Sequence, residues 1–201
     1  MSAPRGRPRS FDDETTLNCV LDVFWKQGFL GTSLVDLCTA TGLNKPSLYG
    51  AFGNKEALFL TALDRYNQLY VAPPIRAMEE EPEAKAALRG YLRAAIRRMA
   101  RPDLPAGCLL MTNMAATGSD DLPEGVAAEM KSLASASRRA VEGRIARAVA
   151  EGQFPKTADA RAFGDFIEAT LFGIASMAQA GTPTEALDRV VDMAMQAWPA
   201  A

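Results

Sequence analysis

Apolar residues recur at helical spacing along almost the whole chain of 201 residues, and this periodicity limits the possible folds more than any other feature. Leu88, Leu92, Ile96 and Met99, for example, repeat every three or four residues, which places them on one face of an α-helix. The alternation of apolar and polar residues that marks a β-strand is scarce. The sequence therefore predicts an all-α fold of about nine helices, with enough residues to bury a sizeable core.

Glycine residues divide the first sixty residues into short helices. Gly28, Gly42 and Gly53 each follow a run of helical periodicity, and glycine is a common helix terminator. Ser33 and Asp36 fit a capping box at the start of the second helix. Short helices separated by tight turns are the arrangement of a helix-turn-helix, so we expect that motif here.

These signals divide the chain into an arm, a head and a body. We expect residues 1–10 to form a flexible basic arm and residues 11–58 to form the helix-turn-helix head. A fourth helix, about 54–71, should connect the head to the body and end at the "APP" sequence that follows it. Residues 72–201 then form a larger helical body.

The lack of histidine excludes several kinds of chemistry. The chain contains no histidine, which removes Ser-His-Asp and Cys-His catalysis and every imidazole-based metal site. The three cysteines, Cys19, Cys38 and Cys108, include no CxxC pair. We therefore expect no enzyme activity, no cofactor and no metal. An all-α enzyme that uses carboxylates in a pocket of the body is the alternative from another class.

Cysteine usage and the composition of the N-terminus indicate the compartment. An odd number of widely spaced cysteines argues against a disulfide framework and for a reducing environment. The N-terminus lacks the apolar core of a signal peptide, and no stretch of about eighteen apolar residues suggests a membrane span. We expect a cytoplasmic protein without a membrane partner.

The third helix presents small, polar and basic residues on the face opposite its apolar side. With Leu48 pointing inward, a turn of about 100° per residue points Pro46 and Tyr49 outward and puts Ser47 on the flank. Lys45 is long enough to reach out from the first turn. Because a major groove about 12 Å wide admits one helix, we predict that Lys45, Pro46, Ser47 and Tyr49 contact DNA.

Two other helix starts flank the third helix. Thr32 and Ser33 open the second helix, and Lys55 opens the fourth. Exposed amides at a helix start, together with a hydroxyl or an ammonium group, suit a phosphate contact. We expect Thr32, Ser33 and Lys55 to bind phosphates, with Ser33 also capping its helix.

Residues 28–59, GFLGTSLVDLCTATGLNKPSLYGAFGNKEALF, resemble the DNA-binding domain of the tetracycline-repressor (TetR) family of transcription regulators. This resemblance implies a homodimer that binds a palindromic operator in double-stranded DNA. It also implies that residues 11–58 are the DNA-binding domain and that residues 72–201 are a divergent ligand-binding and dimerisation domain. The later AGCLLMTNMA, residues 106–115, is similar to a segment of one branch of the family, with a GCLL-type sequence.

The arm carries three arginines with no acidic residue before Asp12. Arg5, Arg7 and Arg9 lie in PRGRPR, which resembles the core of a minor-groove hook. A disordered basic tail that adds only nonspecific attraction explains the same residues equally well. Both interpretations stay open.

The last two predicted helices suit a dimer interface. The penultimate one is apolar around much of its circumference, and a helix of that kind must be buried on both faces. The core explains one face and a partner subunit explains the other. The residues expected at the interface are Phe163, Ile167, Leu171, Ile174, Leu187, Val190, Val191, Ala194 and Trp198.

By the family resemblance, a pocket for an unidentified small-molecule effector lies between the fourth and eighth helices. Aromatic and sulfur-containing side chains suit a largely apolar ligand, and Asn113 would be its polar anchor. The residues expected to line the pocket are Tyr66, Tyr91, Cys108, Met111, Asn113, Met114, Phe166 and Thr170.

We therefore expect a ligand-responsive repressor that a small, largely apolar ligand releases from its operator. Two alternatives keep the DNA-binding head. In one, Cys108 senses oxidants or electrophiles, because a helix start can lower the pKa of a thiol. In the other, the body serves protein contacts and has no small-molecule site.

Overall fold

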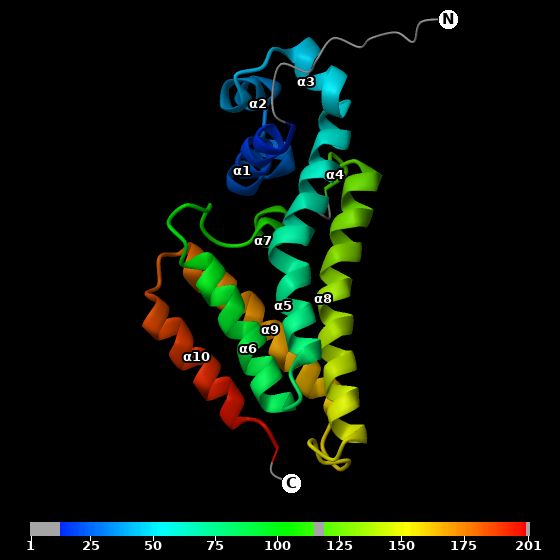
Figure 1. Ribbon diagram of the computed structural model, residues 1–201, viewed down its shortest axis with the longest axis vertical. Helices are drawn as coiled ribbons and strands as arrows, with labels where there is room; N and C mark the ends of the chain where they lie inside the picture. Colours follow the sequence, from blue (N-terminus) through cyan, green and yellow to red (C-terminus); the bar gives the residue numbers. More distant parts are fainter. Residues whose placement is uncertain (1–12, 115–118, 200–201) are drawn as a thin grey trace, which may run out of the picture.

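The computed structural model describes residues 13–114 and 119–199, and these residues form only helices and the turns between them (Figure 1). Three helices make the head: α1 (Asp13–Gly31) and the two short helices α2 (Leu34–Thr41) and α3 (Lys45–Phe52). A continuous helical run leads from the head into the body: α4 (Lys55–Tyr66), the π-helical turn η1 (Asn67–Val71) and α5 (Ala72–Glu80). Within the described residues, 13–114 and 119–199, no helix is long and apolar enough to cross a membrane.

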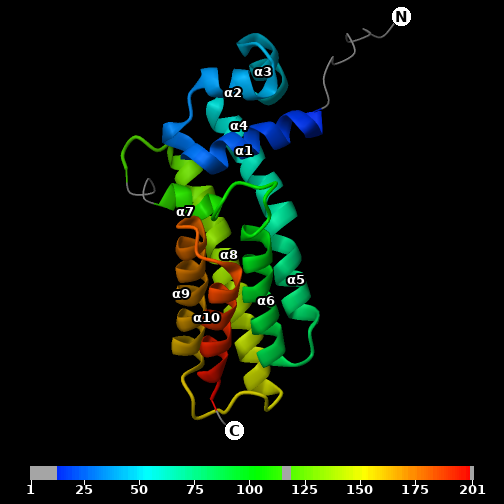
Figure 2. The ribbon, with the colours of Figure 1, turned by 90° about the vertical axis from the view of Figure 1, so that its left-hand side faces the viewer.

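Five further helices complete the body: α6 (Ala84–Met99), α7 (Leu109–Met114), α8 (Glu124–Ala150), α9 (Ala160–Gln179) and α10 (Thr184–Gln196). Figure 2 shows α9, α10 and α6 side by side, with α1 crossing above them. Counted with α4, η1 and α5 as one run, the described part of the chain has nine helices, so the predicted all-α fold is confirmed.

Side-chain caps set the starts of the head helices where the sequence indicates them. Ser33 and Asp36 form the predicted capping box, in which the Ser33 amide donates to the Asp36 carboxylate at 2.8 Å. The Asn44 side chain accepts from the Ser47 amide at 3.0 Å, and Asn54 caps α4 in the same way. These bonds satisfy amides that have no partner inside the helix.

The prediction that "APP" ends the fourth helix is wrong. The helical run continues past Pro73 and Pro74 to Glu80. Its hydrogen-bond ladder first widens, because the Ala72 amide donates to the carbonyl of Asn67, five residues earlier. The prolines then lie in the first turn of α5, where a missing amide hydrogen and a fixed φ are tolerated.

The molecule has two apolar cores, and the first is shared between head and body. It joins α1–α4 to buried residues of α7 and of the N-terminal half of α8, among them Leu109, Leu110, Val126 and Met130. The second core lies within the body and joins α5, α6, α9 and α10 to the C-terminal half of α8. The head therefore does not pack on its own, and α8 contributes to both cores.

A buried asparagine makes the polar link between α7 and α1. The Asn113 side chain is fully buried, and its Oδ1 accepts from the Phe29 amide at 2.7 Å. Its Nδ2 donates to the Leu109 carbonyl at 2.9 Å. Gly28, beside this contact, has φ 72°, and an added Cβ would lie 3.3 Å from Oδ1. Glycine thus permits both the kink in α1 and the close approach of α7.

We expect Asn113→Ala to lower the free energy of unfolding by about 1–3 kcal/mol, because it leaves the buried Phe29 amide without an acceptor. The neighbouring Thr112→Ala removes a half-buried hydroxyl that donates to the carbonyl of Cys108, four residues earlier, and should cost less than about 1 kcal/mol. Urea unfolding followed by circular dichroism measures both. Equal losses in the two variants would contradict a special role for Asn113.

Candidate functional site

Helix α3 lies at one end of the molecule (Figure 1). Its polar side is exposed. Leu48 is fully buried, whereas Lys45, Pro46 and Ser47 are exposed and Tyr49 is half-buried. The Lys45 ammonium lies 5.6 Å from the centre of the Tyr49 ring, so the two side chains form one cationic and aromatic surface. The structure thus places the four predicted base-reading residues together at the tip of the molecule.

The two hydroxyls at the start of α2 have different surroundings. Thr32 is buried, and its hydroxyl donates to the Gly28 carbonyl at 2.6 Å. The prediction that the Thr32 side chain binds phosphate is therefore wrong, because the kink at Gly28 leaves a carbonyl that this hydroxyl satisfies. Ser33 is exposed at the end of the helix, where it forms the capping box. A phosphate contact by Ser33 stays a prediction.

Lys55 lies at the edge of the head, where it packs over an aromatic ring. Its ammonium is 4.5 Å from the centre of the Phe29 ring, and partial burial lowers the pKa of the group. Phe29 is also the residue whose amide bonds to Asn113. Phe29 therefore contacts both α7 and Lys55, the residue predicted to bind phosphate. Arg5, Arg7 and Arg9 lie outside the described residues.

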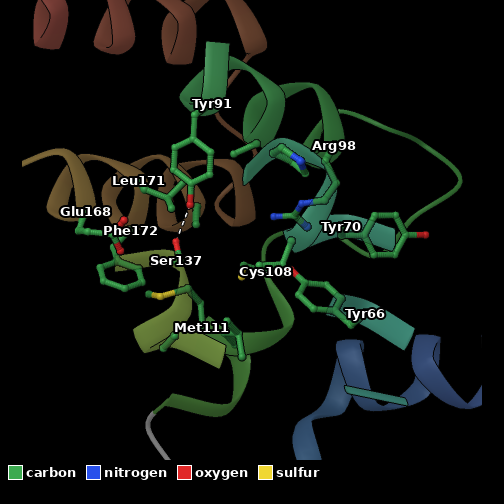
Figure 3. A pocket seen from close by; sticks show the side chains of 16 residues that line it. Tyr66, Tyr70, Tyr91, Arg98, Cys108, Met111, Ser137, Glu168, Leu171 and Phe172 are labelled. Carbon is green, nitrogen blue, oxygen red and sulfur yellow. Dashed lines mark hydrogen bonds between the residues drawn. The ribbon is translucent and has the colours of Figure 1, made fainter. Parts of the chain in front are cut away.

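An enclosed cavity of about 80 Å³ lies in the body next to the head (Figure 3). Its walls come from α4, η1, α5, α6, α8 and α9 and from the segment around α7. Most of the wall is apolar or aromatic, as in many small-molecule sites. The lining residues include Tyr66, Tyr70, Tyr91, Arg98, Cys108, Met111, Ser137, Glu168, Leu171 and Phe172.

Four of the predicted ligand residues, Tyr66, Tyr91, Cys108 and Met111, line this cavity. Asn113 does not, because both ends of its amide are bonded to backbone. Phe166 and Thr170 line a surface groove between α9 and α10 instead, so their placement in the ligand pocket is wrong. Helical spacing could not distinguish the two apolar sides of α9. The side chain of Met114 lies outside the described residues.

Two polar groups at opposite sides of the cavity were not predicted from the sequence (Figure 3). Arg98 donates to the Gly107 carbonyl at 2.9 Å, and its guanidinium lies over the rings of Trp25 and Tyr66. Glu168 is buried, and burial raises the pKa of its carboxyl to about 7, against the opposing effect of a hydrogen bond from Ser137. A carboxyl on a largely apolar helix gave no signal in the sequence.

Hydroxyl and thiol groups continue the polar lining between these ends. Tyr91 and Ser137 share a hydrogen bond through their hydroxyls, and burial raises the pKa of Tyr91. The Tyr66 hydroxyl lies 3.3 Å from the Cys108 sulfur, and burial likewise raises the pKa of this phenol. Within the described part of the chain, no group of three or more acidic or cysteine side chains is placed to hold a metal ion.

Most of the residues predicted at a dimer interface face inward. Six of them are buried within the single chain: Phe163, Ile167, Ile174, Leu187, Val191 and Ala194. In the single chain they pack in the second core, so their side chains do not face outward. Leu171, Val190 and Trp198 are half-buried. The outward face of α9 and α10 carries Phe166, Met177 and Met193, which are 40%, 37% and 65% exposed.

Comparison with known proteins matches both parts of the chain to one family. Residues 21–62 match the family model described as bacterial regulatory proteins of the tetR family. Residues 84–194 match the model described as a tetracyclin repressor-like C-terminal domain. Together these matches cover the head and most of the body.

Three relatives extend the similarity to almost the full length. The transcriptional repressor ComR of Escherichia coli K12 is 31% identical over 97% of this chain and 92% of its own. A cysteine mutant of the TetR family regulator CifR, in complex with 26-bp operator DNA, has a TM-score of 0.89 and 34% identity, covering 96% of this chain and 100% of CifR. A TetR regulator described as putative, from Rhodococcus sp. RHA1, has a TM-score of 0.64 and 31% identity. The match covers 94% of this chain and 100% of the Rhodococcus chain.

Proposed function

The chain belongs to the TetR family of bacterial regulatory proteins, and from this premise we propose that it is a homodimeric repressor that binds operator DNA and is released by a small ligand. The observation that carries the proposal is the exposed tip of α3, where Lys45, Ser47 and Tyr49 lie together above a body with an enclosed cavity. The similarity to ComR and to DNA-bound CifR supports it. We also assign the chain to the branch with the GCLL-type segment, residues 107–110.

On DNA, α3 enters the major groove. Its N-terminal residues Lys45, Pro46 and Ser47 contact base edges, with Tyr49 on the same exposed side. Ser33 and Lys55 at neighbouring helix starts hold the flanking phosphates. The arm with Arg5, Arg7 and Arg9 adds attraction to the same duplex. Two heads about 34 Å apart are needed to read both halves of a palindrome, which is why the dimer matters.

Ligand release works through α7. Met111 faces the cavity, and Asn113, on the same short helix, holds the Phe29 amide of α1. A ligand that displaces Met111 shifts α7 and thereby the head, whose Lys55 rests on the Phe29 ring. The ligand favours the shifted arrangement only by as much as it binds that arrangement more tightly.

A thiol sensor is the second candidate, because Cys108 lines the same cavity and contacts the Tyr66 hydroxyl. Chemical modification of this sulfur would add atoms to a cavity of about 80 Å³ and force its walls apart. The consequence for the head would be the same as that of a bound ligand.

Dimerisation uses the outward face of α9 and α10. Phe166 and Met193 line a groove between these helices, and Met177 lies three turns along α9 from Phe166. Three large apolar side chains gathered on one exposed face are best buried against a second copy of the same face. Gly173, exposed between Phe166 and Met177, allows the partner helix to approach closely.

We expect Lys45→Ala to weaken operator binding about tenfold and to reduce the dependence of affinity on salt by about two counterions, one for each subunit of the dimer. Lys156→Ala is the matched control, since Lys156 is an exposed lysine in the turn between α8 and α9, at the far end of the molecule. Fluorescence anisotropy on DNA flanking the gene, with nonspecific competitor, measures both. Equal effects of the two substitutions would contradict recognition by α3.

If Cys108 is a sensor, iodoacetamide should lower the operator affinity of the wild-type protein about tenfold, the effect of roughly 1–3 kcal/mol of overpacking. Cys108→Ser should abolish this response, whereas Cys19→Ser should retain it. The same anisotropy assay applies, with mass spectrometry to confirm the modified residue. Alkylation of Cys108 without a change in operator affinity would rule out the thiol sensor.

We expect Met193→Glu to raise the dissociation constant of the dimer at least about tenfold, because it places a charge in the apolar interface. Leu69→Glu is the control, since Leu69 is an exposed apolar residue of η1, outside α9 and α10. Sedimentation velocity measures the oligomeric state. A monomeric wild-type protein at micromolar concentration, or equal dissociation of both variants, would contradict this interface.

A further inference from the structure

Glu168 lies where the enclosed cavity meets the surface of the body. It lines the cavity and also a more open hollow between α8 and α9, and the two spaces share Ala134 and Phe172 as well. The side chain is only 7% exposed. We call this meeting point, formed by Ala134, Glu168 and Phe172, the neck. A molecule that enters the cavity from the hollow must pass the Glu168 carboxyl.

One oxygen of this carboxyl has no partner. Glu168 Oε1 is buried and makes no hydrogen bond within the described residues. A buried carboxyl oxygen without a donor costs free energy, so a site of this kind favours a ligand that supplies the donor. The other polar groups nearby are already engaged, since Ser137 bonds to Tyr91.

The charges around the neck also favour a ligand of this kind, in particular one with a positive charge. Arg138 lines the hollow together with Glu168, and its guanidinium is shared between Glu142 and Asp165, each at 2.8 Å. Three carboxyls thus surround one guanidinium, and Glu168 forms no ion pair in the described part of the chain. An incoming cation would offset this excess of negative charge. Arg98, across the cavity, is already bonded to the Gly107 carbonyl and stacked on two rings.

We propose that the effector of this regulator carries a protonated amine that binds the Glu168 carboxylate in the neck, with a compact apolar body in the cavity. This inference rests on the proposed function, because it names the chemistry of the ligand that releases the repressor. The ring of Phe172 in the neck and the ring of Tyr91 in the cavity wall add a favourable surface for a cation. An acidic ligand is disfavoured, because it would place a second negative charge against Glu168.

The size of the cavity limits the apolar body. A cavity of about 150 Å³ is known to hold benzene, and the enclosed space here is about 80 Å³. A short alkyl chain fits without rearrangement, whereas a ring must displace flexible neighbours such as Met111. That displacement is the movement of α7 that the release mechanism requires.

Two matched trios of small molecules test the proposal: butylamine, butanol and butanoate, and benzylamine, benzyl alcohol and benzoate. Isothermal titration calorimetry on the full-length protein should show each amine binding at least about tenfold more tightly than its alcohol, as expected for a charged hydrogen bond. Glu168→Gln should remove this preference and leave the alcohols unchanged. Asp165→Asn, an exposed acid on the same helix, is the control and should largely retain it.

Three results would overturn the proposal: alcohols or carboxylates that bind the wild-type protein as tightly as the amines, amines that do not bind at millimolar concentration, or an amine preference that survives Glu168→Gln. If Asp165→Asn removes the preference as fully as Glu168→Gln, the combined negative potential of the hollow selects the cation. The proposed direct contact between the amine and Glu168 is then wrong.

The pH dependence gives a second readout. Because burial raises the pKa of Glu168 to about 7, the carboxylate that the amine requires becomes populated between pH 6 and pH 8. Amine affinity should rise about tenfold over that range, and Glu168→Gln should flatten the rise. A flat profile for the wild-type protein would contradict the contact. The charged and titratable groups that face Glu168 are Tyr91, Arg98, Cys108, Arg138, Glu142 and Asp165.

Operator binding measured in parallel separates this inference from the proposed function. Operator affinity that falls with benzylamine, whose ring must displace Met111, supports both. Operator affinity that falls only with the alcohols or carboxylates keeps the repressor and overturns the amine. Failure to bind operator DNA at all, with selective amine binding intact, refutes the repressor and leaves the ligand contact standing.

Discussion

The bond between the Phe29 amide and Asn113 is the polar contact that joins the head to the body. It is made in a fully buried place, where losing it leaves a donor unsatisfied, so α1 and α7 are held together in one arrangement. The apolar core around it belongs to both parts of the chain, since Leu109 and Val126 pack with the head helices. A change at α7 therefore cannot stay within the body.

The cavity lies on the other side of α7. The helix that bonds to α1 through Asn113 therefore also forms part of the cavity wall. Met111 faces the cavity while Asn113, two residues later, faces α1. Trp25 of the head and Tyr66 of α4 pack edge to face, and Arg98 of the cavity wall stacks on both. The head thus touches the cavity through an aromatic contact as well as through a hydrogen bond. This closeness is what allows a small ligand to influence a DNA-reading helix.

The body carries polar groups whose use is not evident from packing alone. Glu168 lies on α9, a helix that is otherwise apolar on its inner side, and its carboxyl is kept out of water without an ion pair in the described residues. Such a group raises the free energy of the empty protein. Because the carboxyl lies at the neck of the cavity, a bound ligand that donates a hydrogen bond to it would offset this free energy.

The sequence by itself determined the helices and the starts of those in the head. Periodicity gave the all-α fold, and local bonds such as those of Ser33, Asn44 and Asn54 fixed helix starts, because a cap involves only residues three apart. It also determined the exposed tip of α3, since a buried Leu48 leaves Lys45 and Ser47 outside.

Only the tertiary structure decided which apolar side of α9 faces the core. Ile167 and Phe166 are equally hydrophobic neighbours, yet one is buried and the other exposed. It also decided that Asn113 serves the backbone of α1 and that Glu168 meets a cavity. The physical reason is that helical periodicity describes one helix, whereas burial and hydrogen-bond partners depend on neighbours that are distant in the chain.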